Sequence, residues 1–285
     1  MRIVKVSQLL DDRERNYLLY NGDVIIFEKI PAILELNGYL DRLVQDVFGG
    51  LSKCSMLNEC SSKQDSSVFG VNIERLQNRF RKEPAFADLF RSALKQTGMD
   101  IERNYADVLF LRCVAPLLKK NIHRGRIAHH RDTWGSNIQQ QVNWWSSLYP
   151  TSDENTLVFY PEYWDTPVEN STSEWSYSDF CKARSLAKQK GLSHINYPYA
   201  PEVTQSVLSN KSLSIVTSPG DLVCFSSAHL HGSTEAPRGS CRFSIELRTF
   251  AERSTDLNIP PKNIDNANGE PRYDWFKRLS DKKKY

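Results

Sequence analysis

Near the middle of the chain stand the residues Ala128-His129-His130-Arg131-Asp132-Thr133-Trp134. Within this stretch an imidazole and a carboxylate lie two positions apart, at His130 and Asp132. On an extended strand or at its exit, side chains at i and i+2 point to the same side, so these two could bind one ion. His129 has Arg131 at the corresponding position, so only His130 shares a side with the carboxylate.

A second stretch, about a hundred residues later, supplies further polar groups among strand-like residues. It runs Pro219-Gly220-Asp221-Leu222-Val223-Cys224-Phe225, then His229-Leu230-His231-Gly232-Ser233, then Arg242-Phe243-Ser244. Two His and one carboxylate with open coordination positions are the ligands of a non-haem Fe(II) site. A His-x-Asp pair alone occurs often by chance, whereas the two stretches together indicate a metal site. His229 and His231 are two positions apart and would point to the same face of a strand, so strand alternation does not decide which of them is the ligand.

The composition is that of a globular protein. The chain has 285 residues, of which 40% are apolar and 25% charged, with a net charge of +3. That size allows one domain, 1–285, with a large core, and the charge gives no case for nucleic acid. We expect no membrane segment, because no apolar run is long enough. The start of the chain lacks a signal-peptide core, which predicts a cytoplasmic protein. The lysines at 282–284 indicate a solvated tail.

The cysteines indicate a reducing compartment. They are Cys54, Cys60, Cys113, Cys181, Cys224 and Cys241, and no pair has Cys-x-x-Cys spacing. Some of them sit in apolar, strand-like runs, where buried free thiols are expected. A disulfide between Cys54 and Cys60 is the less favoured alternative.

Residues 1–105 are predicted to be mostly helical, with one opening strand. The strand is 24–27, after the turn signal Asn21-Gly22-Asp23, and Pro31 closes it. Apolar residues recur at helical spacing over 32–48 and over 76–94, with stops at Gly49-Gly50 and Gly98. The Ser-, Asn- and Asp-rich stretch 51–70 is predicted to be a loop.

From 106 to 250 the pattern changes to short strands separated by turns. They are expected at 108–114, 138–148, 157–160, 213–216, 221–225 and 241–250. The region 162–205 interrupts them as an aromatic-rich insertion with a helix over 178–189. Short strands after a helical front predict a mainly β fold with α, a double-sheet sandwich or jelly roll with the N-terminal helices packed outside. The tail, 251–285, is polar, although Trp275 and Phe276 suggest that it docks.

These motifs resemble those of the Fe(II)- and 2-oxoglutarate-dependent oxygenases, in the branch similar to phytanoyl-CoA dioxygenase. The resemblance covers about 106–250 and rests on His130-Arg131-Asp132, on 220–225, on His231-Gly232-Ser233 and on Arg242. It implies a double-stranded β-helix (jelly-roll, cupin-like) core and the cofactors Fe(II), 2-oxoglutarate and molecular oxygen. The Gly-Ser after His231 and the spacing to Arg242 favour His231 over His229.

The resemblance implies a role for each of these residues. His130, Asp132 and His231 would bind the metal, and Arg242 would pair with the distal carboxylate of 2-oxoglutarate, because guanidinium grips carboxylates through two parallel hydrogen bonds. Candidate co-substrate neighbours are Ser233, Ser244, Trp145 and Asn143, of which Asn143 is proposed only because it shares a face with Trp145.

Other residues have plainer interpretations. His123 and His194 have no such partners and read as ordinary loop residues, and Glu162 is either a pocket-rim group or a solvated acid. Related halogenases carry Gly or Ala in place of Asp132, which favours a hydroxylase, or a desaturating or ring-forming oxygenase, here.

Two other functions stay open. One is a cupin-like metal enzyme that needs no 2-oxo acid, and the presence of Arg242 argues against it. The other is an inactive barrel kept as a binding module, against which the intact triad speaks. In the favoured case the substrate is a small molecule, such as a lipid-CoA, an amino acid or a biosynthetic intermediate, and the protein is a monomer or homodimer.

Overall fold

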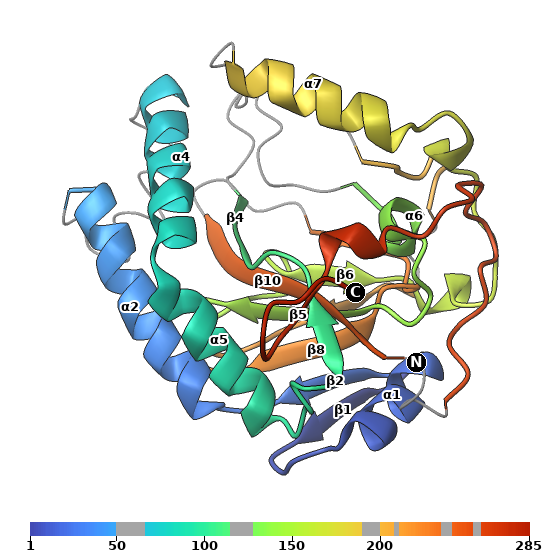
Figure 1. The fold of residues 1–285 in the computed structure, drawn as a ribbon, viewed down its shortest axis with the longest axis horizontal. Coiled ribbons are helices and arrows are strands. Elements are labelled where there is room, and N and C mark those ends of the chain that lie inside the picture. Colours follow the sequence, from blue (N-terminus) through green and yellow to red (C-terminus); the bar gives the residue numbers. More distant parts are fainter. Residues whose placement is uncertain (50–65, 115–127, 190–199, 208–210, 235–240, 253–257) are drawn as a thin grey trace.

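Two β-sheets and a layer of helices make up the part of the chain that the structure describes. The structure is a computed structural model, and it describes residues 1–49, 66–114, 128–189, 200–207, 211–234, 241–252 and 258–285. Figure 1 shows α2, α4 and α5 along one side of the larger sheet, with α7 above it.

The N-terminal part is helical, as predicted, with more elements than expected. It contains β1 (Ile3–Val6), α1 (Asp12–Tyr20), β2 (Val24–Phe27), α2 (Pro31–Val47), α4 (Ser66–Lys82) and α5 (Pro84–Gln96). β2 and α2 match the prediction, whereas β1 and α1 were missed. Asp11 caps α1 through a capping box with Glu14, a spacing that could have revealed the helix.

Proline positions explain two errors in this region. Pro31 was expected only to close a strand, but it occupies the first turn of α2, where a missing N–H costs nothing. Pro84 likewise starts α5 and divides the single helical region expected over 76–94 into two helices. The loop prediction for 51–70 is wrong at 66–70, which belong to α4; residues 51–65 lie outside the described part.

The larger sheet has the strand order β1-β2-β8-β5-β10-β3-β11, with β4 also paired to β10. Its later strands are β3 (Asn104–Ala106), β4 (Phe110–Val114), β5 (Val142–Ser147), β8 (Leu222–Ser226), β10 (Arg242–Ala251) and β11 (Lys277–Arg278). β10 pairs antiparallel with β5 on one side and with β4 and then β3 on the other. The smaller sheet has the order β7-β6-β9, from β6 (Leu157–Phe159), β7 (Leu213–Ile215) and β9 (His231–Ser233).

Strand alternation sorts side chains between two buried layers. Trp144 and Cys224 face the helices and belong to the main core with α2, α4 and α5. Trp145 and Phe225 face the other way and pack with Phe159 of the smaller sheet. Because neighbouring residues on a strand point to opposite faces, the inner face of β5, β8 and β10 lies between the sheets. The predicted site residues of these strands lie on that face.

The remaining elements are short except for one helix. They are α6 (Thr133–Ser136), α7 (Tyr177–Gln189) and three 3-10 turns, Pro161–Tyr163, Ser171–Ser173 and, in the C-terminal tail, Tyr273–Trp275. The helix predicted over 178–189 is confirmed. The tail docks as its aromatic residues suggested: Phe276 is fully buried in a cluster with Tyr105 and Phe250, and β11 pairs with β3.

Two further predictions can be compared with the structure. Cys113, Cys181 and Cys224 are free thiols, and Cys113, Cys224 and Cys241 are buried, whereas Cys54 and Cys60 lie outside the described residues. Within the described part, no helix combines the length and apolarity needed to cross a bilayer.

Candidate metal centre

The two ligand-bearing segments meet in a short antiparallel bridge. The His130 amide donates to the His231 carbonyl at 2.9 Å, and the His231 amide donates to the His130 carbonyl at 3.0 Å. Asp132 lies just past this bridge, at the exit of the extended segment, which the i, i+2 reasoning allowed; its backbone is helical and it is the N-cap residue of α6. The helical turn still directs the carboxylate toward the two imidazoles.

His130, Asp132 and His231 form a compact group of three metal-ligand side chains. One ligand atom from each lies within 4.8 Å of the others. The Nε2 atoms of His130 and His231 lie 3.9 Å and 3.4 Å from Asp132 Oδ2. Such spacing allows all three to reach a single ion.

Both imidazoles are oriented by backbone carbonyls. His130 Nδ1 lies 2.8 Å from the Ala128 carbonyl, and His231 Nδ1 lies 3.0 Å from the His229 carbonyl. A carbonyl can only accept, so each Nδ1 carries the proton and each Nε2 presents a lone pair. Metal-binding histidines are held in this way, so the donor set fits a divalent metal.

The electrostatics keep the donor atoms in their binding forms. Burial, with His231 nearby, lowers the pKa of His130 to about 4, so the ring is neutral at pH 7. Burial alone would raise the pKa of Asp132, but His130, His231 and Arg248 together hold it below its usual value. His130 is thus a neutral imidazole and Asp132 a carboxylate, which are two of the donor types expected for Fe(II).

Asn143 of β5 hydrogen bonds to the Asp132 carboxylate. Its Nδ2 donates to Asp132 Oδ2 at 2.6 Å, and its Oδ1 accepts from Ser227 Oγ at 2.8 Å. Gln141 Nε2 donates in turn to Ser227 Oγ at 2.7 Å. These linked hydrogen bonds fix the orientation of Asp132, whereas the sequence suggested Asn143 only as a neighbour of the co-substrate.

Arg242 is a buried cation with unused hydrogen-bonding capacity. It is 2% exposed, and its Nη2 donates to Ser233 Oγ at 2.8 Å. Nε and Nη1 are buried and find no partner within the described residues. Its guanidinium lies 5.7 Å from the Trp145 ring centroid. Burial lowers the pKa of Arg242 to about 10, and it remains a cation at pH 7.

The other arginines on this inner face already have carboxylate partners. Arg112 of β4 donates from Nε and Nη2 to both oxygens of Glu246, at 2.6 Å and 2.7 Å. Arg248 pairs with Asp107 at 2.5 Å. Ser244 Oγ donates to Glu246 Oε1 at 3.2 Å. Arg242 therefore differs from its neighbours in lacking such a partner among the described residues.

Sequence reasoning overlooked this polar network, although a signal was present. Along β10, Arg242, Ser244, Glu246 and Arg248 alternate with the apolar Phe243, Ile245 and Leu247. Such alternation normally places polar residues in solvent. Here both faces are covered, so the polar positions mark a charged interior.

The side chains of the other two described histidines, His129 and His229, contact aromatic residues. His129 Nε2 lies 2.8 Å from the Tyr160 hydroxyl. His229 is buried with its ring 4.4 Å from that of Trp164, and burial lowers its pKa to about 3. His123 and His194 lie outside the described residues. Glu162 forms a 2.7 Å ion pair with Lys211 at the surface.

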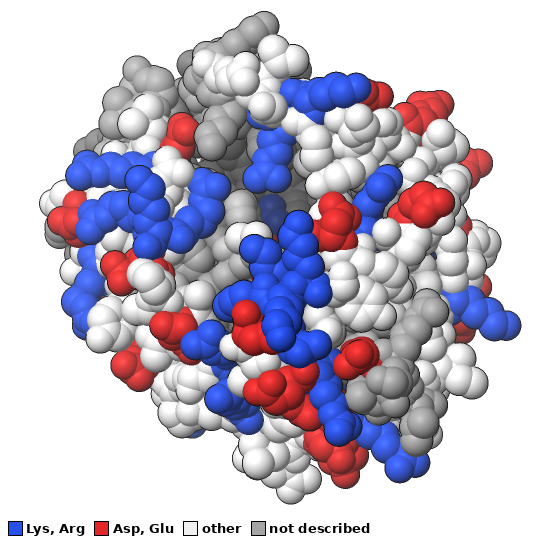
Figure 2. All heavy atoms as spheres, in the orientation of Figure 1, with Lys and Arg blue, Asp and Glu red and all other residues white. Residues whose placement is uncertain are grey.

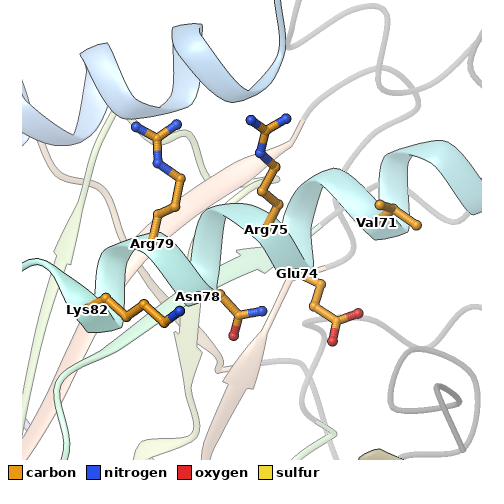
Figure 3. Close-up of a pocket in the computed structure, with 6 residues that line it drawn as sticks. All are labelled: Val71, Glu74, Arg75, Asn78, Arg79 and Lys82. Carbon is orange, nitrogen blue, oxygen red and sulfur yellow. The ribbon is translucent and has the colours of Figure 1, made fainter.

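The hollow on the face seen in Figure 2 differs in character from the hollow along α4. Figure 2 shows a face hollowed near its centre, with Lys and Arg side chains around and inside the hollow. Another hollow is lined by one side of α4, from Val71, Glu74, Arg75, Asn78, Arg79 and Lys82 (Figure 3). The α4 hollow contains none of the predicted site residues, and Arg79 already pairs with Asp46 of α2.

No model of a known protein family matches the chain, and no characterised protein sequence matches it. Several solved structures are distantly similar. EvdO2 from Micromonospora carbonacea var. aurantiaca complexed with 2-oxoglutarate gives a TM-score of 0.47 at 14% identity, over 94% of this chain and 97% of that one.

Two further structures are similar at about the same level. The epimerase SnoN in complex with Fe3+, alpha ketoglutarate and nogalamycin RO gives a TM-score of 0.42 at 11% identity, over 93% of this chain and 96% of that one. The non-heme monooxygenase ThoJ gives 0.41 at 10% identity, over 91% and 88%. Two of these three structures hold 2-oxoglutarate.

Proposed function

We propose that this chain is an Fe(II)- and 2-oxoglutarate-dependent oxygenase acting on a small organic substrate. The observation that carries the proposal is Arg242, a buried cation with two donor nitrogens that lack partners in the described part of the chain. It is joined through Ser233 to β9, the strand that begins with the candidate ligand His231. The short strand β9 therefore carries one metal ligand, His231, and the side chain that holds the carboxylate-binding Arg242, and this reaction needs both groups near each other.

In this proposal His130, Asp132 and His231 hold the iron through their Nε2 and carboxylate oxygen atoms. Bound Fe(II) would supply the activation of oxygen, with 2-oxoglutarate oxidised to succinate and carbon dioxide as one oxygen atom enters the substrate C–H bond. Desaturation or ring closure would use the same oxidant. Residues of this chain contribute orientation: carbonyls fix both imidazoles, and Asn143 fixes the carboxylate.

Arg242 would bind the distal carboxylate of 2-oxoglutarate through Nη1, which has no partner in the described part of the chain. Nη2 has a second N–H besides the one that it donates to Ser233, so Nη1 and Nη2 together would offer two parallel hydrogen bonds to one carboxylate. Ser233 keeps the guanidinium in place, and the Trp145 ring packs beside it. Ser244 belongs to the adjoining Glu246 network and would lie next to this pocket. Binding a carboxylate there would remove the cost of a buried unpaired cation.

We further propose that the two sheets form a double-stranded β-helix of the phytanoyl-CoA-dioxygenase-like kind within a single domain spanning 1–285. The order of the strands supports this. β5, β8 and β10 belong to the larger sheet, while β6, β7 and β9, which lie between them in the chain, belong to the smaller one. The inserted region 162–205, with α7, would then border the site and help to select the substrate.

Titration of 2-oxoglutarate into anaerobic protein tests the proposal. We expect calorimetric binding that requires both Fe(II) and Arg242, followed by succinate release when oxygen and a substrate from a metabolite screen are added. Tight iron binding without 2-oxoglutarate binding would instead support a cupin-like enzyme. Absence of iron binding would support an inactive barrel.

A further inference from the structure

Arg131 lies between two candidate metal ligands in the chain, and its side chain takes part in a buried ion pair. Its Nε donates to Asp265 Oδ2 at 3.0 Å, and the two side chains are only 2% and 4% exposed. Asp265 belongs to the C-terminal tail, outside every motif that indicated the metal site. Two charges this deeply buried depend on each other.

The same guanidinium also reaches the segment that carries the second histidine. Arg131 Nη1 donates to the Ala228 carbonyl at 2.6 Å, three residues before His231. Its Nη2 donates to the carbonyls of Tyr163 and Thr166, at 2.7 Å and 3.1 Å. Arg131 thus ties the His130 segment to the His231 segment and to the start of the insertion.

Asp265 is fully engaged in holding this arrangement. Its Oδ1 accepts from Trp134 Nε1 at 2.7 Å, and its Oδ2 also accepts from the Val168 amide at 3.2 Å. The next tail residue, Asn266, donates to the Thr133 carbonyl at 2.8 Å. The tail therefore contacts the ligand segment immediately after Asp132.

In the described part of the chain, regular secondary structure does little to hold the segment from His130 to Asp132 in place. His130 forms an isolated bridge to His231, and α6 is a single turn with no side-chain cap from Asp132. A metal site tolerates small displacements poorly, because all three donors must meet at one point. Side-chain contacts such as those of Arg131 are then needed to hold His130 and Asp132 in register with His231.

We propose that Asp265 is a positioning residue of the metal centre, acting through Arg131 and Trp134. This inference rests on the proposed function, since it assumes that His130, Asp132 and His231 bind a metal. It assigns the C-terminal tail a part in metal affinity, although Asp265 itself is not a ligand. Without the Asp265 carboxylate, Arg131 would lose its buried ion-pair partner, and its segment would shift in response.

Co(II) binding to the anaerobic full-length protein tests this, read by calorimetry and by the visible spectrum of the ion. We expect Asp265→Asn to weaken Co(II) by about 10- to 100-fold, the range seen when groups that orient ligands are removed, and to alter the spectrum. Glu270→Gln, an exposed acid in the same tail, is the matched control and should bind as wild type.

A second control separates positioning from general loss of stability. Leu40→Ala removes a buried side chain in the helix layer, far along the chain from either ligand segment, and should lower the melting temperature without changing Co(II) affinity or spectrum. If Asp265→Asn does not fold, Trp134→Phe, which removes the hydrogen bond to Asp265 Oδ1, is measured in its place.

The outcomes separate the two levels of inference. Unchanged Co(II) affinity and spectrum in a folded Asp265→Asn or Trp134→Phe protein would overturn the positioning role and leave the proposed function intact. Wild-type protein that binds Co(II) no better than His231→Ala would overturn the metal site itself, and the positioning role with it.

Discussion

Arg242 on β10 donates from Nη2 to the Ser233 hydroxyl on β9 at 2.8 Å, joining the two sheets across the interior. β9 begins with His231, so one short strand offers a metal ligand and a partner for the buried cation. A residue that uses one donor within the fold and keeps two without partners in the described chain is arranged for a ligand rather than for stability.

Removing any member of the triad should abolish metal binding. We expect His130→Ala, Asp132→Ala and His231→Ala each to lose iron after anaerobic reconstitution, because a three-ligand site cannot lose one donor and keep its geometry. His129→Ala and His229→Ala should retain it, since those rings contact Tyr160 and Trp164. An inactive His229→Ala protein beside an active His231→Ala protein would reverse the assignment.

Arg242→Met should weaken 2-oxoglutarate by about 2–5 kcal/mol, the cost of removing one partner of a buried charge pair. Calorimetric titration of the Fe(II)-loaded protein measures this. Arg112→Gln is the comparison, because Arg112 already pairs with Glu246 and should matter less. Equal 2-oxoglutarate affinity in wild type and Arg242→Met would move the carboxylate receptor elsewhere.

The same substitution should stabilise the ligand-free protein. Burying Arg242 without a carboxylate costs free energy, so Arg242→Met should raise the free energy of unfolding by about 1–4 kcal/mol in urea titrations. With Mn(II) and 2-oxoglutarate added, the wild type should instead have the higher free energy of unfolding, because only the wild type binds the dianion. A less stable ligand-free Arg242→Met protein would mean that the cation is compensated within the fold.

This stability difference should also depend on pH. Burial lowers the pKa of Arg242 in the folded state to about 10, below that of an arginine in the unfolded chain. Between these two pKa values the unfolded chain binds one more proton than the folded protein, so the free energy of unfolding of the wild type rises with pH there. The difference in free energy of unfolding between Arg242→Met and the wild type should therefore be constant below pH 10 and become smaller above it. A difference that stays constant well above the folded-state pKa would contradict this.

Asn143→Ala should weaken the binding of the metal rather than the binding of the co-substrate. Asn143 donates to Asp132 Oδ2, and losing a group that orients a ligand typically costs about 10- to 100-fold in metal affinity. Ser227→Ala, one step further along the series of hydrogen bonds, should have a smaller effect. If Co(II) binds Asn143→Ala normally while 2-oxoglutarate binds poorly, Asn143 contacts the co-substrate, as the sequence suggested.

Helix α7 should respond to ligands if the inserted region borders the substrate. The ring contacts of Tyr177 and Phe180 are with Trp175 and Trp275, and most of the described residues of the helix are exposed. Segments that close over a site exchange their amides quickly until the ligand binds. Hydrogen exchange over Tyr177–Gln189 should slow with metal, 2-oxoglutarate and substrate. If the amide exchange rate in this segment does not change with any ligand, the segment only packs against the rest of the fold and does not border the substrate.

Short-range patterns carried much of the prediction. The i, i+2 spacing paired His130 with Asp132, and apolar periodicity located α2 and most of the strands, because these signals depend on neighbouring residues. Local chemistry also separated His130 from His129. Strand alternation alone did not separate His231 from His229; the Gly-Ser after His231 and the spacing to Arg242 favoured His231, and in the folded chain His231 is the one that forms the bridge with His130.

Long-range partners were decided by the tertiary structure. Nothing near Asn143 in sequence reveals that its amide meets Asp132, and nothing near Asp265 reveals Arg131, because each contact forms only when distant segments pack together. The alternation on β10 was visible, yet only the second sheet turns its polar face into an interior. The sequence determined which residues can do the chemistry, while burial decided that Arg242 remains without a carboxylate partner in the described structure and Arg112 does not.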